Sequence, residues 1–153
     1  MKLPVSVLVV VHTPVLEVLL MERARRAGYW QSVTGSLDWA EEPLADAALR
    51  EVREETGIDA PRMALKAWNV TYTFEIYAHW RHRFAPGVTH NVEHPFRLEV
   101  PSACAVALAA EEHTSYEWLP WRAAAARCFS WSNRDAIRML GEARRNVPER
   151  SPS

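Results

Sequence analysis

Three glutamates at helical spacing constrain this chain more than any other feature of its sequence. Glu51, Glu54 and Glu55 occupy positions i, i+3 and i+4 of the run REVREETGI (residues 50–58), so their side chains share one helix face about 5–6 Å apart. Like charges at this spacing cost roughly 0.2–0.5 kcal/mol per pair, and carboxylates in a last helical turn also oppose the helix dipole. A divalent cation would reverse both penalties, because hard cations such as Mg²⁺ prefer carboxylate oxygens.

The segment that carries these glutamates is also the clearest helix in the sequence, expected at about Pro43 to Thr56. Pro43 suits a first helical turn, and Gly57 suits the left-handed residue that ends a helix. Apolar residues recur between them at helical spacing: Leu44, Ala47, Ala48 and Val52. Taken alone, such a glutamate face is more often a solvated surface, on which Arg50 and Glu54 form an ordinary i,i+4 ion pair.

The rest of the chain is expected to form a mixed β-sheet sandwiched between helices, an α/β (α+β) fold. β-Branched and apolar runs predict strands at residues 5–11, 15–21, 65–80, 92–100, 103–109 and 116–119. The first two should form a hairpin, and Gly28 and Gly35 bracket a short extended segment that leads to a glycine-rich bend. Further helices are expected at 121–128 and 132–145, the second begun by a capping box of Ser132 and Asp135. A sheet with helices on its faces buries all of these elements.

Size and composition predict one domain with a small-molecule partner. The 153 residues suffice for a single core, expected at 1–146, with a polar, proline-rich and frayed tail at 147–153. A net charge of -1 provides no global basic field, which argues against nucleic acid as a partner. The apolar run near the amino terminus is too short to span a bilayer, so no membrane partner is expected. Two cysteines, Cys104 and Cys128, make no disulfide scaffold, which favours a cytoplasmic location.

The segment from Gly35 to Ile58 resembles the Nudix box, whose pattern is G-x5-E-x7-R-E-U-x-E-E-x-G-U with U an apolar residue. From Glu42 onward the pattern is intact, including both apolar positions. One departure is that six residues rather than five separate Gly35 from Glu42. Glu41 would restore the first spacing but break the second, and an extra residue is tolerated better in a bend than inside a helix. We therefore align the box on Glu42.

The resemblance implies a Nudix fold and hydrolysis of a phosphoanhydride bond with Mg²⁺, which Mn²⁺ can replace. Glu51 and Glu55, with Glu54 beside them, would hold the cation against a polyphosphate, and Arg50 would hold the carboxylates in place. A carboxylate near the metal would deprotonate the attacking water. Glu54 and the more distant Glu112 are both candidates for this base.

Segments along nearly the whole chain resemble one branch of the family, the bacterial dihydroneopterin triphosphate diphosphatases. These segments include WQSVTGS (30–36), FEIY (74–77), RHRFAPGVT (81–89), EH (112–113) and SWSNR (130–134). The branch releases pyrophosphate from dihydroneopterin triphosphate in folate synthesis. Matching positions imply that the metal ligands are Glu51, Glu55 and Glu112. They imply substrate contacts at Lys2, Arg23, Thr34, Phe74, Glu75, Ile76, Tyr77 and Ser130.

Other interpretations stay open. A nucleoside triphosphate pyrophosphohydrolase acting on dATP or related nucleotides needs the same metals and a similar flat pocket. A non-catalytic, ligand-binding Nudix-fold module would keep the fold but not the chemistry. Phe74 and Tyr77 could be core aromatics, and Lys2 could be a frayed terminus. The basic cluster at 81–83 could steer a triphosphate or be a solvated turn. The nearby histidines lack a tetrahedral partner set, which argues against structural zinc.

Overall fold

The first apolar run of the sequence becomes the central strand of the fold, β1 (Val5–His12). In the computed structural model, which describes residues 1–145, β1 pairs in parallel with β7 (His90–Glu99) along its whole length. On its other side it pairs with β4 (Val33–Ser36) near its beginning and with β2 (Glu17–Arg23) at its end. The expected domain boundary at residue 146 and the expected tail at 147–153 lie outside the described residues.

The remaining strands extend this sheet on both sides. β2 also pairs with β3 (Trp30–Gln31) and β8 (His113–Pro120), whereas β7 also pairs with β5 (Leu65–Ala67) and β6 (Tyr72–Glu75). The chain passes from β3, beside β2, to β4, beside β1, through the buried Ser32. β2 and β4 therefore flank the same side of β1, and the sheet divides between them.

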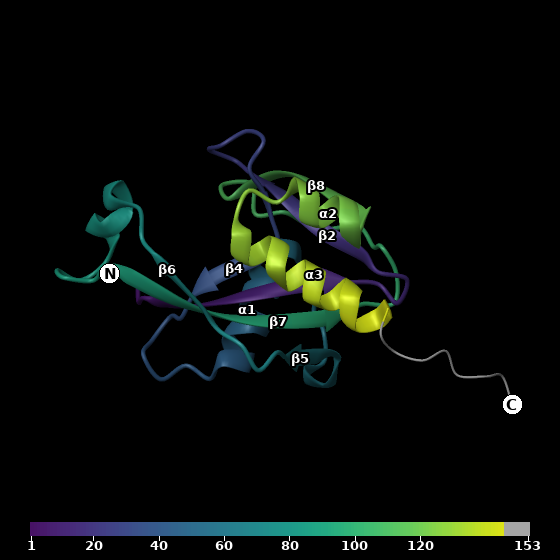
Figure 1. Cartoon of the computed structure of the whole chain (residues 1–153), viewed down its shortest axis with the longest axis horizontal. Helices are drawn as coiled ribbons and strands as arrows, with labels where there is room; N and C mark the ends of the chain where they lie inside the picture. Colours follow the sequence, from purple (N-terminus) through teal and green to yellow (C-terminus); the bar gives the residue numbers. More distant parts are fainter. Residues whose placement is uncertain (146–153) are drawn as a thin grey trace, which may run out of the picture.

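Helices cover both faces of this sheet (Figure 1). α1 (Leu44–Thr56) packs on one face, and α2 (Trp121–Arg127) and α3 (Trp131–Arg145) pack on the other. Alternate residues of β1 divide between the two cores: Val7 and Val9 belong to the α1 side, and Leu8 and Val10 to the α2–α3 side. The predicted mixed sheet between helices is confirmed. Within residues 1–145, no helix combines the length and apolar character needed to cross a membrane.

Helix α1 begins and ends where its sequence predicts. Pro43 occupies the position before Leu44 with extended backbone, and Gly57 adopts φ 75° after Thr56. The Gly57 N–H donates to the Arg53 carbonyl at 2.9 Å, which satisfies one of the last carbonyls of the helix. This end of the helix is therefore held in one geometry.

The expected strand at 103–109 is wrong. The segment pairs with no strand and instead crosses the end of α1, where the Ala107 N–H donates to the Thr56 carbonyl at 2.9 Å. Val106 and Leu108 are partly buried against the core on the α1 side, so their apolar character reflects this packing and not sheet pairing. The segment thus leads the chain from the carboxyl end of α1 to the beginning of β8.

Two further expectations need correction. The strand expected at 65–80 is two short strands followed by a 3₁₀ helix, η2 (Ala78–Arg83), so only parts of it are extended. The capping box of Ser132 and Asp135 is absent because α3 begins one residue earlier, and the Asn133 N–H donates to the Ser130 hydroxyl. The Asp135 carboxylate instead accepts a hydrogen bond from the Tyr72 hydroxyl at 2.6 Å.

Candidate active site

The three helix glutamates differ in how far they reach into the protein. Glu55 is only 3% exposed, whereas the side chain of Glu54 is 55% exposed and pairs with Arg50 at 3.3 Å. The Glu51 side chain lies between these extremes and accepts a hydrogen bond from Arg50 at 2.9 Å. Glu51 and Glu55 are thus turned toward the interior, and Glu54 stays at the surface.

Arg50 organises the acidic groups around the first half of the Nudix-like segment. Its Nε and Nη2 donate to the two carboxylate oxygens of Glu42, each at 2.9 Å, while the Asp38 N–H donates to the same carboxylate at 2.8 Å. The hydrogen bonds between Arg50 and Glu42 lower the pKa of Glu42 and raise the pKa of Arg50. Glu42 is buried and Glu41 is exposed. The alignment of the glutamate pattern on Glu42 is therefore confirmed.

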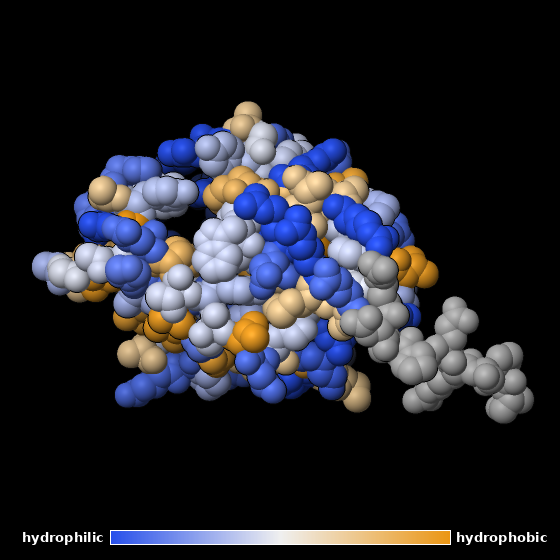
Figure 2. All heavy atoms as spheres, viewed as in Figure 1, coloured by the Kyte–Doolittle hydropathy of each residue, from blue (hydrophilic) through white to orange (hydrophobic). Residues whose placement is uncertain are grey.

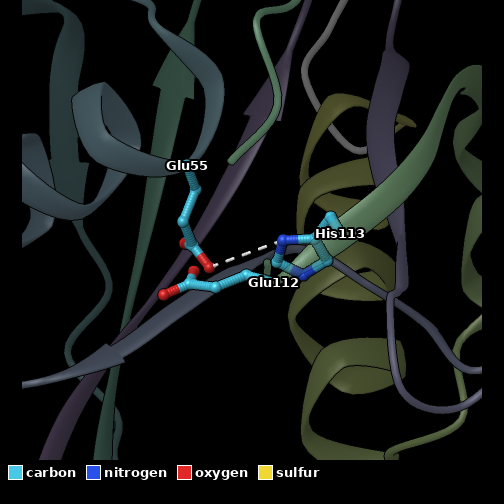
Figure 3. Close-up of side chains that lie close together, drawn as sticks. All are labelled: Glu55, Glu112 and His113. Atoms are coloured by element: carbon cyan, nitrogen blue, oxygen red, sulfur yellow. Dashed lines mark ion pairs between the residues drawn. The ribbon is translucent and has the colours of Figure 1, made fainter. Parts of the chain in front are cut away.

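A second element brings another carboxylate to Glu55. Glu112 and His113 stand at the start of β8, and one potential ligand atom from each lies within 4.8 Å of the others and of Glu55 (Figure 3). In the view, the carboxylate of Glu55 hangs from α1 toward that of Glu112, with the imidazole beside them. Glu112 is exposed, and Glu55 and His113 are buried. Groups more than fifty residues apart in sequence thus share one small volume.

The orientation of His113 is set by Gln31, whose Nε2 lies 3.1 Å from His113 Nε2. With the amide nitrogen donating, the imidazole proton lies on Nδ1, which faces Glu55 Oε1 at 3.9 Å. Burial lowers the pKa of His113 to about 4, so the ring is neutral near pH 7 and the contact is not an ion pair. Glu55 consequently gains no compensating positive charge from this side.

The buried carboxylates fit a divalent cation better than they fit one another. Burial, followed by the charges of Glu51 and Glu112, raises the pKa of Glu55 well above its usual range, and burial raises the pKa of Glu51 to about 7. Within residues 1–145, Glu55 Oε2 is buried and has no hydrogen-bond partner. Oxygen donors arranged around such an atom are the ligands that hard divalent cations prefer.

Gly35 lets Glu51 lie against the sheet. Gly35 is a residue of β4 and not part of the bend expected from sequence, and its φ is not in the left-handed region. A Cβ at this position would lie 2.1 Å from the Glu51 carboxyl carbon. The glycine is therefore required by close approach of a side chain rather than by backbone conformation.

A cavity of about 490 Å³ opens beside this carboxylate, between β4, the η2 region and the first turn of α3. The space-filling view shows the molecule hollowed between the η2 region and the beginning of α3 (Figure 2). All eight residues expected to contact the substrate line it: Lys2, Arg23, Thr34, Phe74, Glu75, Ile76, Tyr77 and Ser130. Phe74 and Tyr77 are cavity residues and not core aromatics, since Phe74 is half-buried and Tyr77 is exposed.

Basic side chains gather where the cavity meets the carboxylates. Lys2 is anchored because its N–H donates to the Arg83 carbonyl at 2.8 Å, so the amino terminus is not frayed at this point. Burial, then Arg83 and Arg23, lower the pKa of Lys2, while Glu51 and Glu112 raise it. Of the basic cluster at 81–83, Arg83 lines the cavity, whereas Arg81 pairs with Glu75. Lys2 thus lies near Glu51 and Glu112, with Arg23 and Arg83 close to it.

Sequence reasoning missed several polar residues of this region. His113 follows Glu112 directly, but its contact with Glu55 depends on the fold. Gln31 lines the cavity from β3, and Asn91 and Glu93 line it from β7. Asn91 and Glu93 did carry a signal, because two polar residues alternate within an otherwise strand-like run, which marks a face that is not ordinary core.

Comparison with known proteins agrees with this geometry. The NUDIX domain profile matches residues 2–140. The chain is 45% identical over 139 residues to the dihydroneopterin triphosphate diphosphatase of Escherichia coli (strain K12), covering 89% of this chain and 91% of that protein. It is 36% identical over 136 residues to the Haemophilus influenzae protein of the same name, covering 87% and 84%. A solved structure of the Escherichia coli dihydroneopterin triphosphate pyrophosphohydrolase superposes with a TM-score of 0.82 at 44% identity, covering 91% of this chain and 95% of that chain.

Proposed function

The chain belongs to the Nudix family, and from that premise we propose that it hydrolyses dihydroneopterin triphosphate to the monophosphate and pyrophosphate, a cytoplasmic step of folate biosynthesis. The observation that carries the proposal is that all eight expected contact residues line one cavity, and that the acidic side chains lie beside it: Gly35 of the lining lies against Glu51, and Lys2 is close enough to Glu51 and Glu112 for their charges to raise its pKa. Relatives at 45% and 36% identity are named for this activity. Its partner is a small molecule and not a nucleic acid.

Glu51, Glu55 and Glu112 hold Mg²⁺ in this proposal, and Mn²⁺ can replace it. Their fit rests on the unpartnered, buried oxygen of Glu55 and on the raised pKa values of Glu51 and Glu55. When bound, the cation neutralises polyphosphate charge and makes phosphorus more open to attack. Arg50 fixes Glu51 through the hydrogen bond at 2.9 Å, so this ligand is oriented before the cation arrives.

In this proposal the basic side chains bind the phosphates, and a carboxylate takes the proton from the attacking water. Lys2, Arg23 and Arg83 bind phosphate oxygens at the mouth of the acidic group. The proton of the attacking water passes to a carboxylate at this end, for which Glu54 and Glu112 are the exposed candidates. Glu54 is the one that the cation does not need, and its contact with Arg50 keeps it beside the site.

Aromatic side chains at the other end of the cavity suit a flat bicyclic ring. Phe74, Tyr77 and Trp131 all line it, and Trp131 is 50% exposed, so its surface is available to a ligand. Ring faces of this kind bury aromatic area and stack against a heterocycle. A purine would also stack here, which is why dATP is the substrate to compare.

The test is a comparison of specificity constants for dihydroneopterin triphosphate and dATP at saturating Mg²⁺, measured by pyrophosphate release. We expect kcat/KM to be at least about tenfold higher for the pterin substrate, since a few well-placed ring contacts are worth that factor. Chelation with EDTA should abolish turnover of both. A preference for dATP would overturn the assignment of substrate, and metal-independent turnover would overturn the role of the carboxylates.

A further inference from the structure

Glu93 is a buried carboxylate that the chemistry at the other end of the cavity does not use. It stands in the middle of β7, is 5% exposed and lines the cavity. Among the lining side chains within residues 1–145, it alone carries a fully buried polar atom without a hydrogen-bond partner, its Oε1. An unpartnered buried carboxylate oxygen is costly unless a ligand or another group satisfies it.

The register of the sheet separates Glu93 from the metal-binding carboxylates. Glu93 pairs with Ser6 of β1, and Ser6 pairs with Ser36 of β4, the strand against which Glu51 rests. With neighbouring strands about 4.8 Å apart, Glu93 lies roughly 10 Å from the backbone of β4. It therefore faces the part of the cavity that a ring, and not the phosphates, would occupy.

The polar neighbours of Glu93 are already engaged with one another. Asn91 Nδ2 donates to the Ser6 hydroxyl at 2.8 Å, and Asn133 uses both ends of its amide, accepting from the Ser32 N–H at 2.9 Å and donating to the Ser130 hydroxyl at 2.8 Å. The Ser132 hydroxyl also lies beside the Glu93 carboxylate, and among residues 1–145 the Oε1 of Glu93 is the fully buried polar atom of the lining that has no partner.

From this placement we propose that Glu93 recognises the aminopyrimidinone edge of the substrate, accepting one hydrogen bond from a ring N–H and one from the adjacent amino group. The proposal rests on the proposed function, in which the ring occupies this end of the cavity. An ionised carboxylate only accepts hydrogen bonds, and two adjacent N–H donors match its two oxygens. Pterin and guanine rings present that pair of donors, whereas adenine presents one donor beside an acceptor.

Burial gives this pairing its selectivity. It raises the pKa of Glu93 to about 7, against a smaller opposing effect of the Ser132 hydroxyl, so the ionised form is short of stabilising partners. Two N–H donors would supply them. A ring with the wrong edge leaves the carboxylate unpaired, which discriminates more strongly than a missing apolar contact does.

The decisive experiment uses Glu93→Gln and ring substrates that differ at this edge. The glutamine amide offers one donor and one acceptor, which match adenine. We expect the ratio of kcat/KM for dGTP to that for dATP to fall at least about tenfold in E93Q. Glu99→Gln is the matched control, because it makes the same change at an exposed position of the same strand and should leave the ratio as it is in the wild type. An equal loss of both activities in E93Q, or an unchanged ratio, overturns the proposal.

A second measurement uses only the wild-type protein. dITP lacks the 2-amino group of dGTP and is otherwise identical, so wild-type kcat/KM should be at least about fivefold lower for dITP. Equal constants overturn the proposal even if E93Q fails to fold. The two proposals fail separately: a wild type that discriminates against dITP but prefers dGTP over the pterin triphosphate refutes only the substrate. If the wild type prefers the pterin triphosphate, but does not discriminate against dITP and has the same dGTP-to-dATP ratio as E93Q, only the proposed role of Glu93 in ring recognition is refuted.

Discussion

The two ends of the cavity are built on opposite principles. At the phosphate end, α1 and the start of β8 bring Glu51, Glu55 and Glu112 together, although burial and mutual repulsion raise the pKa values of Glu51 and Glu55. At the ring end, the side chains mostly satisfy one another, and Glu93 alone retains a fully buried oxygen without a partner among the described lining residues. The ionised carboxylates at the phosphate end require a bound cation to offset their repulsion. The unpartnered oxygen at the ring end requires only a hydrogen-bond donor from a ring.

The difference separates reaction from selectivity. The phosphate end depends on the spacing of residues within one helix and on Arg50, and it would act on any polyphosphate delivered to it. The ring end depends on β6, β7 and the first turn of α3, whose residues are distant in sequence. Changes at the first end should therefore affect turnover of all substrates alike, and changes at the second should affect which substrate is preferred.

The largest effect should come from breaking the phosphate end with Glu55→Gln. Loss of this ligand should lower kcat by on the order of 10³-fold, about 4 kcal/mol of barrier. The metal-free protein should become no less stable, because burial already disfavours the ionised Glu55 carboxylate and the glutamine amide is neutral. Pyrophosphate release and thermal unfolding without metal measure the two effects. Glu111→Gln, at an exposed position outside the acidic group, is the control. A Glu55→Gln variant that retains full turnover would contradict the metal site.

Substitution of two glycines by alanine should have a smaller effect. It distinguishes a glycine required by the close approach of a side chain, Gly35, from one required by its backbone conformation, Gly28. In Gly35→Ala the new Cβ forces the Glu51 carboxylate to move, and a displaced catalytic group costs on the order of 10²-fold in kcat with little change in Tm. Gly28 has φ 83° and open space around it, so Gly28→Ala should cost about 1 kcal/mol of stability and leave kcat unchanged. Equal kcat losses in the two variants would refute the role given to Gly35.

The smallest effect is a pH dependence that distinguishes the two ends. The pKa of Glu93 rises to about 7 in the folded protein, so its stabilising contribution is complete below its unfolded pKa near 4.5 and is lost as pH rises through 7. At saturating Mg²⁺, which offsets the similar effects of Glu51 and Glu55, the wild type should lose up to about 1.4 kcal/mol per pH unit between pH 5 and 7 through Glu93. Thermal unfolding across pH 5 to 8 should show a flatter curve for E93Q, and parallel curves would contradict the assignment.

Local patterns predicted the parts of the site that lie within single elements. The boundaries of α1 and the contact of Arg50 with Glu54 followed from spacing, because helix geometry fixes which side chains are neighbours. The residues that line the cavity were expected from the resemblance. The 103–109 segment could not be predicted in this way. Its apolar residues suit a strand, but Val106 and Leu108 pack, partly buried, against the core on the α1 side, and the Ala107 N–H donates to the Thr56 carbonyl.

The sequence by itself determined a helix with three acidic side chains on one face and the need for a positive partner, since charge and helical spacing are local properties. Only the tertiary structure decided which of them are buried, that Glu112 and His113 join Glu55, and that the Oε1 of Glu93 has no partner among residues 1–145. The physical reason is that burial and hydrogen-bond satisfaction depend on every element that packs around a group, and no single segment of the chain contains that information.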